Sequence, residues 1–174
     1  PLSLETLFPF LALLWLMISL VPVFVIDFRY HLLPDTISIG GIIFGVAISF
    51  IPGDITPLQS ILGALIAGGG LYLFAKLIAK ILGKQAMGFG DVKLLAGYGA
   101  LMGAPLAFET LILASFIGIC IVFPARLVYA KAFGTESETT AGEFPFGPFL
   151  ALAAPIVFIY GNWILGLYLA MFEV

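Results

Sequence analysis

The sequence predicts an all-α membrane protein, a polytopic bundle of about six transmembrane helices of which the fourth is short. Of its 174 residues, 62% are hydrophobic and only 10% are charged, and the mean hydropathy is +1.20. Apolar stretches of about 20 residues are typical of transmembrane helices, whereas a β-barrel shows alternating segments of about 10 residues. The chain has the former pattern. We therefore expect residues 1–174 to form a single membrane-embedded domain.

The apolar stretches divide the chain into spans at residues 6–26, 36–51, 58–80, 91–103, 107–129 and 146–172. The first is predicted to be a permanent span, because it has no preceding Lys or Arg and no small-residue cleavage site of a signal peptide. Prolines, which interrupt helices, lie at or near the boundaries, at positions 34, 52, 57 and 105.

The fourth span is the exception in length. About 13 residues make a helix of roughly 20 Å, less than the hydrocarbon core of ~30 Å. It is therefore predicted to be a half-depth helix packed among the others. Glycines at 97, 99 and 103 would permit that close approach.

Charged residues are sorted between the two ends of these spans. All seven Lys and Arg residues lie in or beside three connections, 27–35, 81–90 and 130–145. The opposite side holds acids alone, namely Glu5, Asp54, Glu109 and Glu173. The positive-inside rule then places the three connections in the cytoplasm and both termini outside. Asp27, Asp35 and Asp91 consequently fall on the cytoplasmic side, at helix ends.

Composition also disfavours several kinds of function. The net charge is −3 and no basic face is evident, so we expect no nucleic-acid partner. Cys120, the only cysteine, lies in an apolar run and is predicted to be a packed core residue, since one cysteine makes neither an internal disulfide nor a thiolate zinc site. His31, the only histidine, is interpreted as an interfacial residue. We predict no cofactor and no metal site.

Asp27 closes the first span and Asp91 opens the fourth. A carboxylate near hydrocarbon is costly, which favours a functional site with a nearby partner. Paired carboxylates suit acid/base hydrolysis because neighbouring like charges resist double ionisation, so one acid keeps a proton while the other activates water. Gly88 and Gly90 give the backbone before Asp91 conformational freedom and would let an extended substrate chain approach.

Structural interpretations of these residues stay open. Asp35 and Asp91 are both suited to be helix N-caps, and Asp27 to pair with Arg29 or Lys93. Lys93 itself is suited either to hold one carboxylate ionised or to extend towards lipid headgroups. The alternative function is an ion-coupled transporter that uses the same aspartates as proton or cation sites, although transporters usually place such residues near the membrane midplane. A structural subunit of a secretion assembly is a third hypothesis.

Three segments occur in order along the chain: DFRYHLLPD at 27–35, GFGDVKLL at 88–95 and FPFGPFL at 144–150. Together they resemble the type IV prepilin peptidases, membrane aspartyl proteases of the Gly-x-Gly-Asp class. The resemblance implies an endopeptidase that removes the basic leader from type IV prepilins or type II secretion pseudopilins, at the cytoplasmic face of the bacterial inner membrane. By position, Asp27 and Asp91 match the catalytic pair, with supporting residues at Asp35, Gly88, Gly90 and Lys93.

Long-form members of that family carry an N-terminal segment with two Cys-x-x-Cys pairs, a zinc-binding arrangement associated with N-methylation of the cut pilin. This sequence contains no such pairs. The resemblance therefore implies either the peptidase core of a longer chain or a short member, and we predict neither zinc nor methyl transfer. The loop 133–143 carries three glutamates, which favour either a solvated connection or a docking site for a basic leader.

Overall fold

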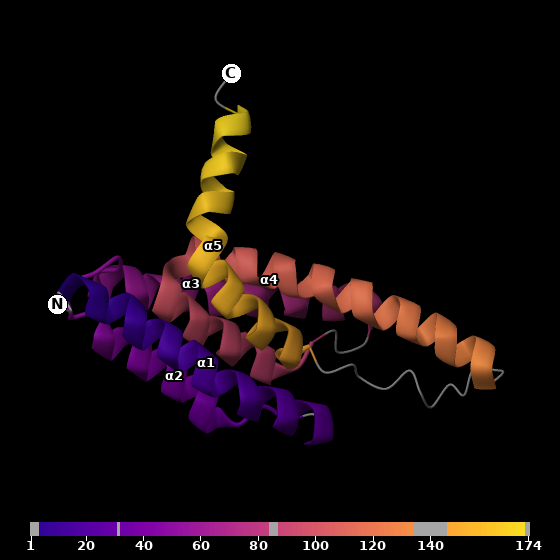
Figure 1. Ribbon diagram of the computed structural model, residues 1–174. Coiled ribbons are helices and arrows are strands. Elements are labelled where there is room, and N and C mark those ends of the chain that lie inside the picture. Colours follow the sequence, from indigo (N-terminus) through magenta and orange to yellow (C-terminus); the bar gives the residue numbers. More distant parts are fainter. Residues whose placement is uncertain (1–3, 31, 84–86, 134–145, 173–174) are drawn as a thin grey trace.

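The computed structural model describes residues 4–30, 32–83, 87–133 and 146–172, and the regular secondary structure within them is helical. The helices shown in Figure 1 are α1 (Leu4–Tyr30), α2 (Asp35–Ile48), α3 (Pro57–Leu82), α4 (Phe89–Phe133) and α5 (Gly147–Phe172). The prediction of an all-α protein is confirmed.

Helix α4 consists of two segments that meet at Gly103. This residue has φ 81° and ψ 166°, a conformation outside the helical region that favours glycine. Pro105 follows at once and lacks the N–H that would continue the hydrogen-bond ladder. The first segment (89–102) and the second segment (104–133) therefore correspond closely to the fourth and fifth predicted spans.

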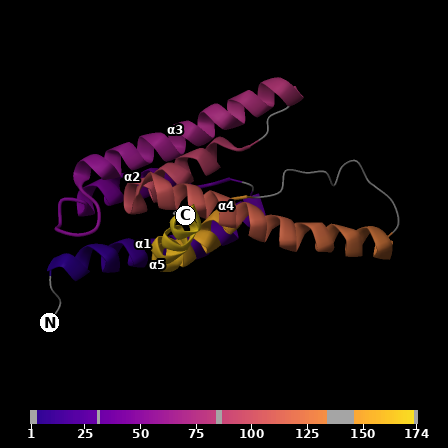
Figure 2. The ribbon, with the colours of Figure 1, turned by 90° about the horizontal axis from the view of Figure 1, so that it is seen from above.

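The second segment of α4 runs back along α3. A Cβ built at Gly99 would contact the backbone of Gly63 in α3, whereas the ring of Phe108 lies against Gly70, further along α3. Figures 1 and 2 show the same reversal from two directions. The predicted boundary between the fourth and fifth spans is thus the break at Gly103, where the two helical segments of α4 meet.

The first segment of α4 occupies the centre of the bundle. Nearly all of its residues are buried, and α4 packs against α3, α2 and α5. Small residues make this possible: Gly99 contacts Gly63, and a Cβ at Gly45 of α2 would lie 2.8 Å from the Cβ of Ala100. Ser60 of α3 donates a 2.7 Å hydrogen bond to the carbonyl oxygen of Ala100, near the end of the segment, where carbonyl groups need hydrogen-bond donors from outside the helix. The prediction of a short helix packed among the others is confirmed.

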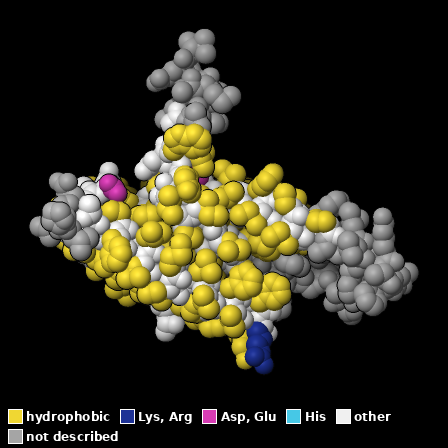
Figure 3. All heavy atoms as spheres, viewed as in Figure 1, with side chains coloured by type: hydrophobic (Ala, Val, Ile, Leu, Met, Phe, Trp, Pro, Cys, Tyr) yellow, Lys and Arg dark blue, Asp and Glu magenta, His cyan; other side chains and the backbone are white. Residues whose placement is uncertain are grey.

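Apolar side chains cover the outer surface of the bundle, as Figure 3 shows for one face. Several large ones are more than half exposed, among them Phe10, Ile18, Leu65, Phe74 and Phe116. An apolar surface of this extent is unfavourable in water and favourable in hydrocarbon. Together with the helical backbone, which satisfies its own hydrogen bonds, it identifies a multi-pass membrane protein.

In the described part of the chain, six helical segments correspond to the six predicted spans when the two segments of α4 are counted separately. Four helices, α1, α3, α4 and α5, are long and apolar enough to cross a membrane, with α4 counted as one element. Helix α2 has 14 residues, which at 1.5 Å per residue gives about 21 Å. Six full spans are therefore not confirmed, and α2 joins the first segment of α4 as a short apolar helix.

One burial prediction is wrong. Cys120, expected in the core, is exposed on the second segment of α4. The run around it is apolar on every side, so its sequence carries no signal of which face points inward.

Candidate active site

Asp27 lies in the last turns of α1 and is only 5% exposed. Its neighbour is Gly147, the first residue of α5: a Cβ there would lie 2.6 Å from Asp27 Oδ2. The bare α-carbon of Gly147 thus packs against the carboxylate. Because a helix begins at this point, its first N–H groups and its dipole give the surroundings of Asp27 a positive potential.

Asp91 lies in the first turn of α4 and is 7% exposed. Asp27 interacts with it electrostatically, although the two residues belong to different helices far apart in the sequence. Two acids that are neighbours in a poorly solvated place resist carrying two negative charges. This is the arrangement that general acid/base hydrolysis by a carboxylate pair requires.

Leu33 connects the helix ends that carry these acids. A Cβ at Gly90 would lie 2.8 Å from Leu33 Cβ, and a Cβ at Gly147 would lie 3.0 Å from Leu33 Cδ2. The leucine side chain therefore occupies the space that side chains at both positions would need. Through it, Gly90, Gly147 and the described residues around Asp27 meet at one end of the bundle.

The two glycines before Asp91 differ in what lies beside them. The close approach that Gly90 permits is made by Leu33 of the same chain. Gly88 is exposed, and the Asp91 Oδ2 atom, 3.6 Å from a Cβ built there, is its nearest contact among the described residues. Of the two glycines, Gly88 is therefore the one that is accessible from outside the protein.

Lys93 pairs with Asp35. Its Nζ donates a hydrogen bond of 2.6 Å to Asp35 Oδ1 and lies 5.0 Å from the ring centroid of Phe89. Of the two roles open to Lys93 on sequence grounds, the structure favours pairing, and the partner is Asp35. This ion pair ties the start of α2 to the start of α4.

The helix-cap interpretation of Asp35 and Asp91 is wrong. The N-cap of α2 is Pro34, without a side-chain cap hydrogen bond, and Asp35 is the first helical residue. Helix α4 begins at Phe89, so Asp91 lies inside its first turn. Both carboxylates are in first turns, where the helix dipole favours a negative charge.

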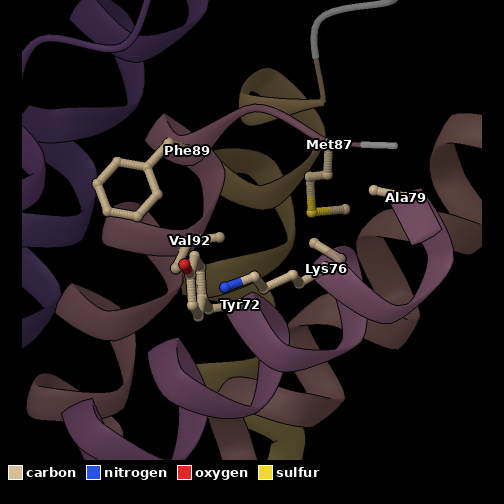
Figure 4. A pocket seen from close by; sticks show the side chains of 7 residues that line it. Tyr72, Lys76, Ala79, Met87, Phe89 and Val92 are labelled. Carbon is tan, nitrogen blue, oxygen red and sulfur yellow. The ribbon is translucent and has the colours of Figure 1, made fainter. Parts of the chain in front are cut away.

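A pocket of about 190 Å³ lies beside the first turn of α4, between α3 and the segment that precedes Asp91. It is lined by Tyr72, Ala75, Lys76, Ala79, Met87, Phe89 and Val92. Figure 4 shows the Lys76 amine and the Tyr72 ring next to each other, and Nζ of Lys76 lies 5.5 Å from the ring centroid. The rest of the wall is apolar, so the pocket suits an apolar group better than a cationic one.

The sequence profile of the type IV leader peptidase family matches residues 11–123, a range that includes both Asp27 and Asp91. This chain belongs to the type IV leader peptidase family.

Curated members of the family are similar to it over most of its length. The "Prepilin leader peptidase/N-methyltransferase" of Legionella pneumophila is 35% identical over 172 residues, covering 94% of this chain and 55% of the relative. The protein of the same name from Pseudomonas putida is 36% identical over 153 residues, covering 87% and 50%. The chain spans about half the length of these curated relatives. No solved structure matches it significantly.

Two residues at the site of this family member went unrecognised in the sequence. Leu33 lies in the segment 27–35 and Gly147 in the segment 144–150, but neither is among the predicted site residues. The available signal was local: each adjoins a proline, at 34 and 148, which fixes the backbone where a helix begins. That signal marks a helix start and does not say which distant groups meet there.

Three other features considered in the sequence remain: a metal site, His31 and the acidic loop. Among the described residues, no three His, Cys, Asp or Glu side chains come together as a potential metal site. His31 and positions 134–143 of the acidic loop lie outside the described residues.

Proposed function

We propose that this chain is a membrane aspartyl endopeptidase that cleaves the basic leader from type IV prepilins or type II secretion pseudopilins. The observation that carries the proposal is the pair of buried acids, Asp27 and Asp91, which interact at one end of a membrane bundle. Membership of the type IV leader peptidase family supports it, and so do the names of the curated relatives.

The proposed mechanism needs one protonated and one ionised aspartate. The ionised member takes a proton from water, whose oxygen attacks the peptide carbonyl carbon, while the protonated member gives its proton to the carbonyl oxygen. When the tetrahedral intermediate collapses, the C–N bond breaks and a proton passes to the leaving amine. The products are a free carboxylate and a free amine, and no side chain of the enzyme is covalently modified.

The surroundings of the pair suggest how a substrate would lie. The substrate's apolar helix would lie in the bilayer against α3 and α4, where the pocket beside Asp91 has apolar walls. Lys76 on that wall would repel a basic leader, so we place the leader on the opposite side of the aspartates. We place this end of the bundle at the cytoplasmic face of the bacterial inner membrane, because the basic residues gather in its connections.

The test uses purified protein in detergent with a prepilin, comparing wild type with Asp27→Asn and Asp91→Asn. The matched control is Asp54→Asn, because Asp54 is an exposed aspartate outside the site, in the connection between α2 and α3. Loss of a positioned acid or base typically reduces rate by about 10²–10⁴-fold. We expect that loss in the first two variants and none in the control. Cleavage at the normal rate by either site variant would refute the assignment of the pair.

The competing hypothesis of an ion-coupled transporter makes a different prediction. Such a protein, reconstituted in vesicles, would show proton or cation uptake that Asp27→Asn abolishes. We expect uptake no faster than in empty vesicles, since both aspartates lie at helix ends.

A further inference from the structure

Gly147 is a glycine for reasons of space. Positive φ angles among the described glycines occur at Gly83 and Gly103, so the backbone at Gly147 does not require glycine. A side chain there would displace the ends of two other side chains, because Asp27 Oδ2 lies 2.6 Å and Leu33 Cδ2 3.0 Å from a built Cβ. The start of α5 is therefore fitted against a carboxylate and a leucine at once.

Leu33 makes the same kind of contact on the other side. It lies in the short connection between α1 and α2, preceding Pro34, and is partly buried. Its Cβ and Cδ1 would lie 2.8 and 3.0 Å from a Cβ at Gly90, one residue before Asp91. One side chain thus abuts the backbone next to each aspartate: Gly90 beside Asp91, and Gly147 beside Asp27.

We propose that Gly147 and Leu33 are positioning residues that set the Asp27 carboxylate relative to Asp91. This inference rests on the proposed function. The first turn of α5 limits how far Asp27 Oδ2 can move in one direction. The leucine fixes the distance between that turn and the start of α4. At Gly90 and at Gly147 the leucine side chain faces glycine backbone, which cannot change rotamer to make room for it.

The size of the effect follows from the contact distance. Carbon and oxygen atoms in ordinary contact are separated by about 3.5 Å, so a methyl group at Gly147 would displace the carboxylate by about 1 Å. A misplacement of about 1 Å in a catalytic group can cost about 100-fold in rate. Gly147→Ala is therefore expected to lower kcat by about 10- to 100-fold and to leave KM within about twofold.

The matched control is Gly166→Ala. Gly166 lies in the same helix, and no described atom lies within 4 Å of a Cβ built there. The substitution is chemically identical and adds the same methyl group to α5. We expect wild-type kcat and KM. A general effect of alanine on α5 would instead slow both variants alike.

Leu33 provides a second, independent variant in case Gly147→Ala does not fold. Leu33→Ala removes the side-chain atoms that reach Gly147 and leaves Asp27 itself unchanged. It should lower kcat by about 10-fold. Leu33→Met, which keeps the volume with a flexible chain, should recover most of that loss. A residue that served stability alone would lower the fraction of folded enzyme and leave kcat per folded molecule unchanged.

A spectroscopic measurement separates this inference from the proposed function. The infrared carboxyl bands of the purified protein should differ between Gly147→Ala and wild type, and the difference should vanish when Asp27→Asn is present in both. If wild type does not cleave a prepilin, the proposed function fails, while the infrared result still decides whether Gly147 sets the carboxyl environment. Wild-type kcat in Gly147→Ala together with unchanged carboxyl bands would overturn the inference.

Discussion

Replacing Gly99 by alanine tests how the bundle holds its central helix. In the first segment of α4, Gly99 faces the backbone of α3: a methyl group there would lie 2.7 Å from the carbonyl carbon of Gly63 and 2.9 Å from Ala67 Cβ. Contacts between carbon atoms are favourable at about 3.5–4.0 Å. The two helices would have to separate by about 1 Å, because backbone atoms cannot rotate away as a flexible side chain can.

Two opposing effects decide the net change in the free energy of unfolding. Overpacking of a tightly packed interface typically costs about 1–3 kcal/mol. Alanine in place of glycine inside a helix contributes about 1 kcal/mol in the other direction. The cost of overpacking is expected to exceed the gain in helix propensity. The added methyl group would meet the backbone of Gly63, which has no side chain that could rotate away. We expect Gly99→Ala to destabilise the protein by up to about 2 kcal/mol.

The assay is reversible unfolding in mixed micelles, in which a mild detergent is titrated with dodecyl sulfate and helix content is followed by circular dichroism. The control is Gly69→Ala on α3, where no described atom lies within 4 Å of the added methyl group. That variant should gain up to about 1 kcal/mol from helix propensity. If Gly99→Ala is as stable as Gly69→Ala, the close approach of α3 and α4 is not what makes glycine necessary at position 99.

Three further predictions concern single contacts. Lys93→Met should lower the free energy of unfolding by no more than about 1 kcal/mol, and less in high salt, because its partner Asp35 is 62% exposed; a larger loss in the same micelle assay would contradict a solvent-screened pair. Ser60→Ala should cost about 1–3 kcal/mol in that assay, since it removes a buried 2.7 Å hydrogen bond to a backbone carbonyl, and an unchanged transition would show that the carbonyl finds another partner. Ala79→Leu should fill the pocket beside Asp91 and raise KM for the prepilin with little change in kcat; unchanged KM would mean that the pocket does not contact the substrate.

The sequence was sufficient to predict where the helices lie, because apolar runs and helix-breaking residues act locally. Long apolar runs predicted α1, α3 and α5, and Pro105 marked the boundary that the structure places at the break within α4. It was insufficient for burial on a uniformly apolar helix, as Cys120 shows, since lipid-facing and buried positions are both hydrophobic in a membrane. It was also insufficient to show whether α2 crosses the membrane completely, because an apolar helix of 14 residues resembles a span in composition while being shorter.

For the site, the sequence singled out two acids as candidates, and the structure adds which groups lie beside each of them. Asp27 and Asp91 were singled out as acids at the ends of apolar helices, a feature visible in one dimension. The pairing of Lys93 with Asp35 and the contact of Gly147 with Asp27 depend on the packing of separate helices. No local pattern encodes such distances, so these partners could not have been derived from the chain alone.

The geometry of the pair depends on how closely the backbones approach. Asp91 stands on a helix that approaches α3 and α2 through small residues: Gly99 lies against Gly63 of α3, and Ala100 against Gly45 of α2. Asp27 faces a glycine at the start of α5. Contacts between backbones have little freedom to relax, whereas long side chains can change rotamer. We therefore expect small-to-larger substitutions at such glycines to impair catalysis even though they alter no charge and remove no hydrogen bond. A site that relied on flexible hydrogen-bonding side chains would tolerate the same added methyl groups.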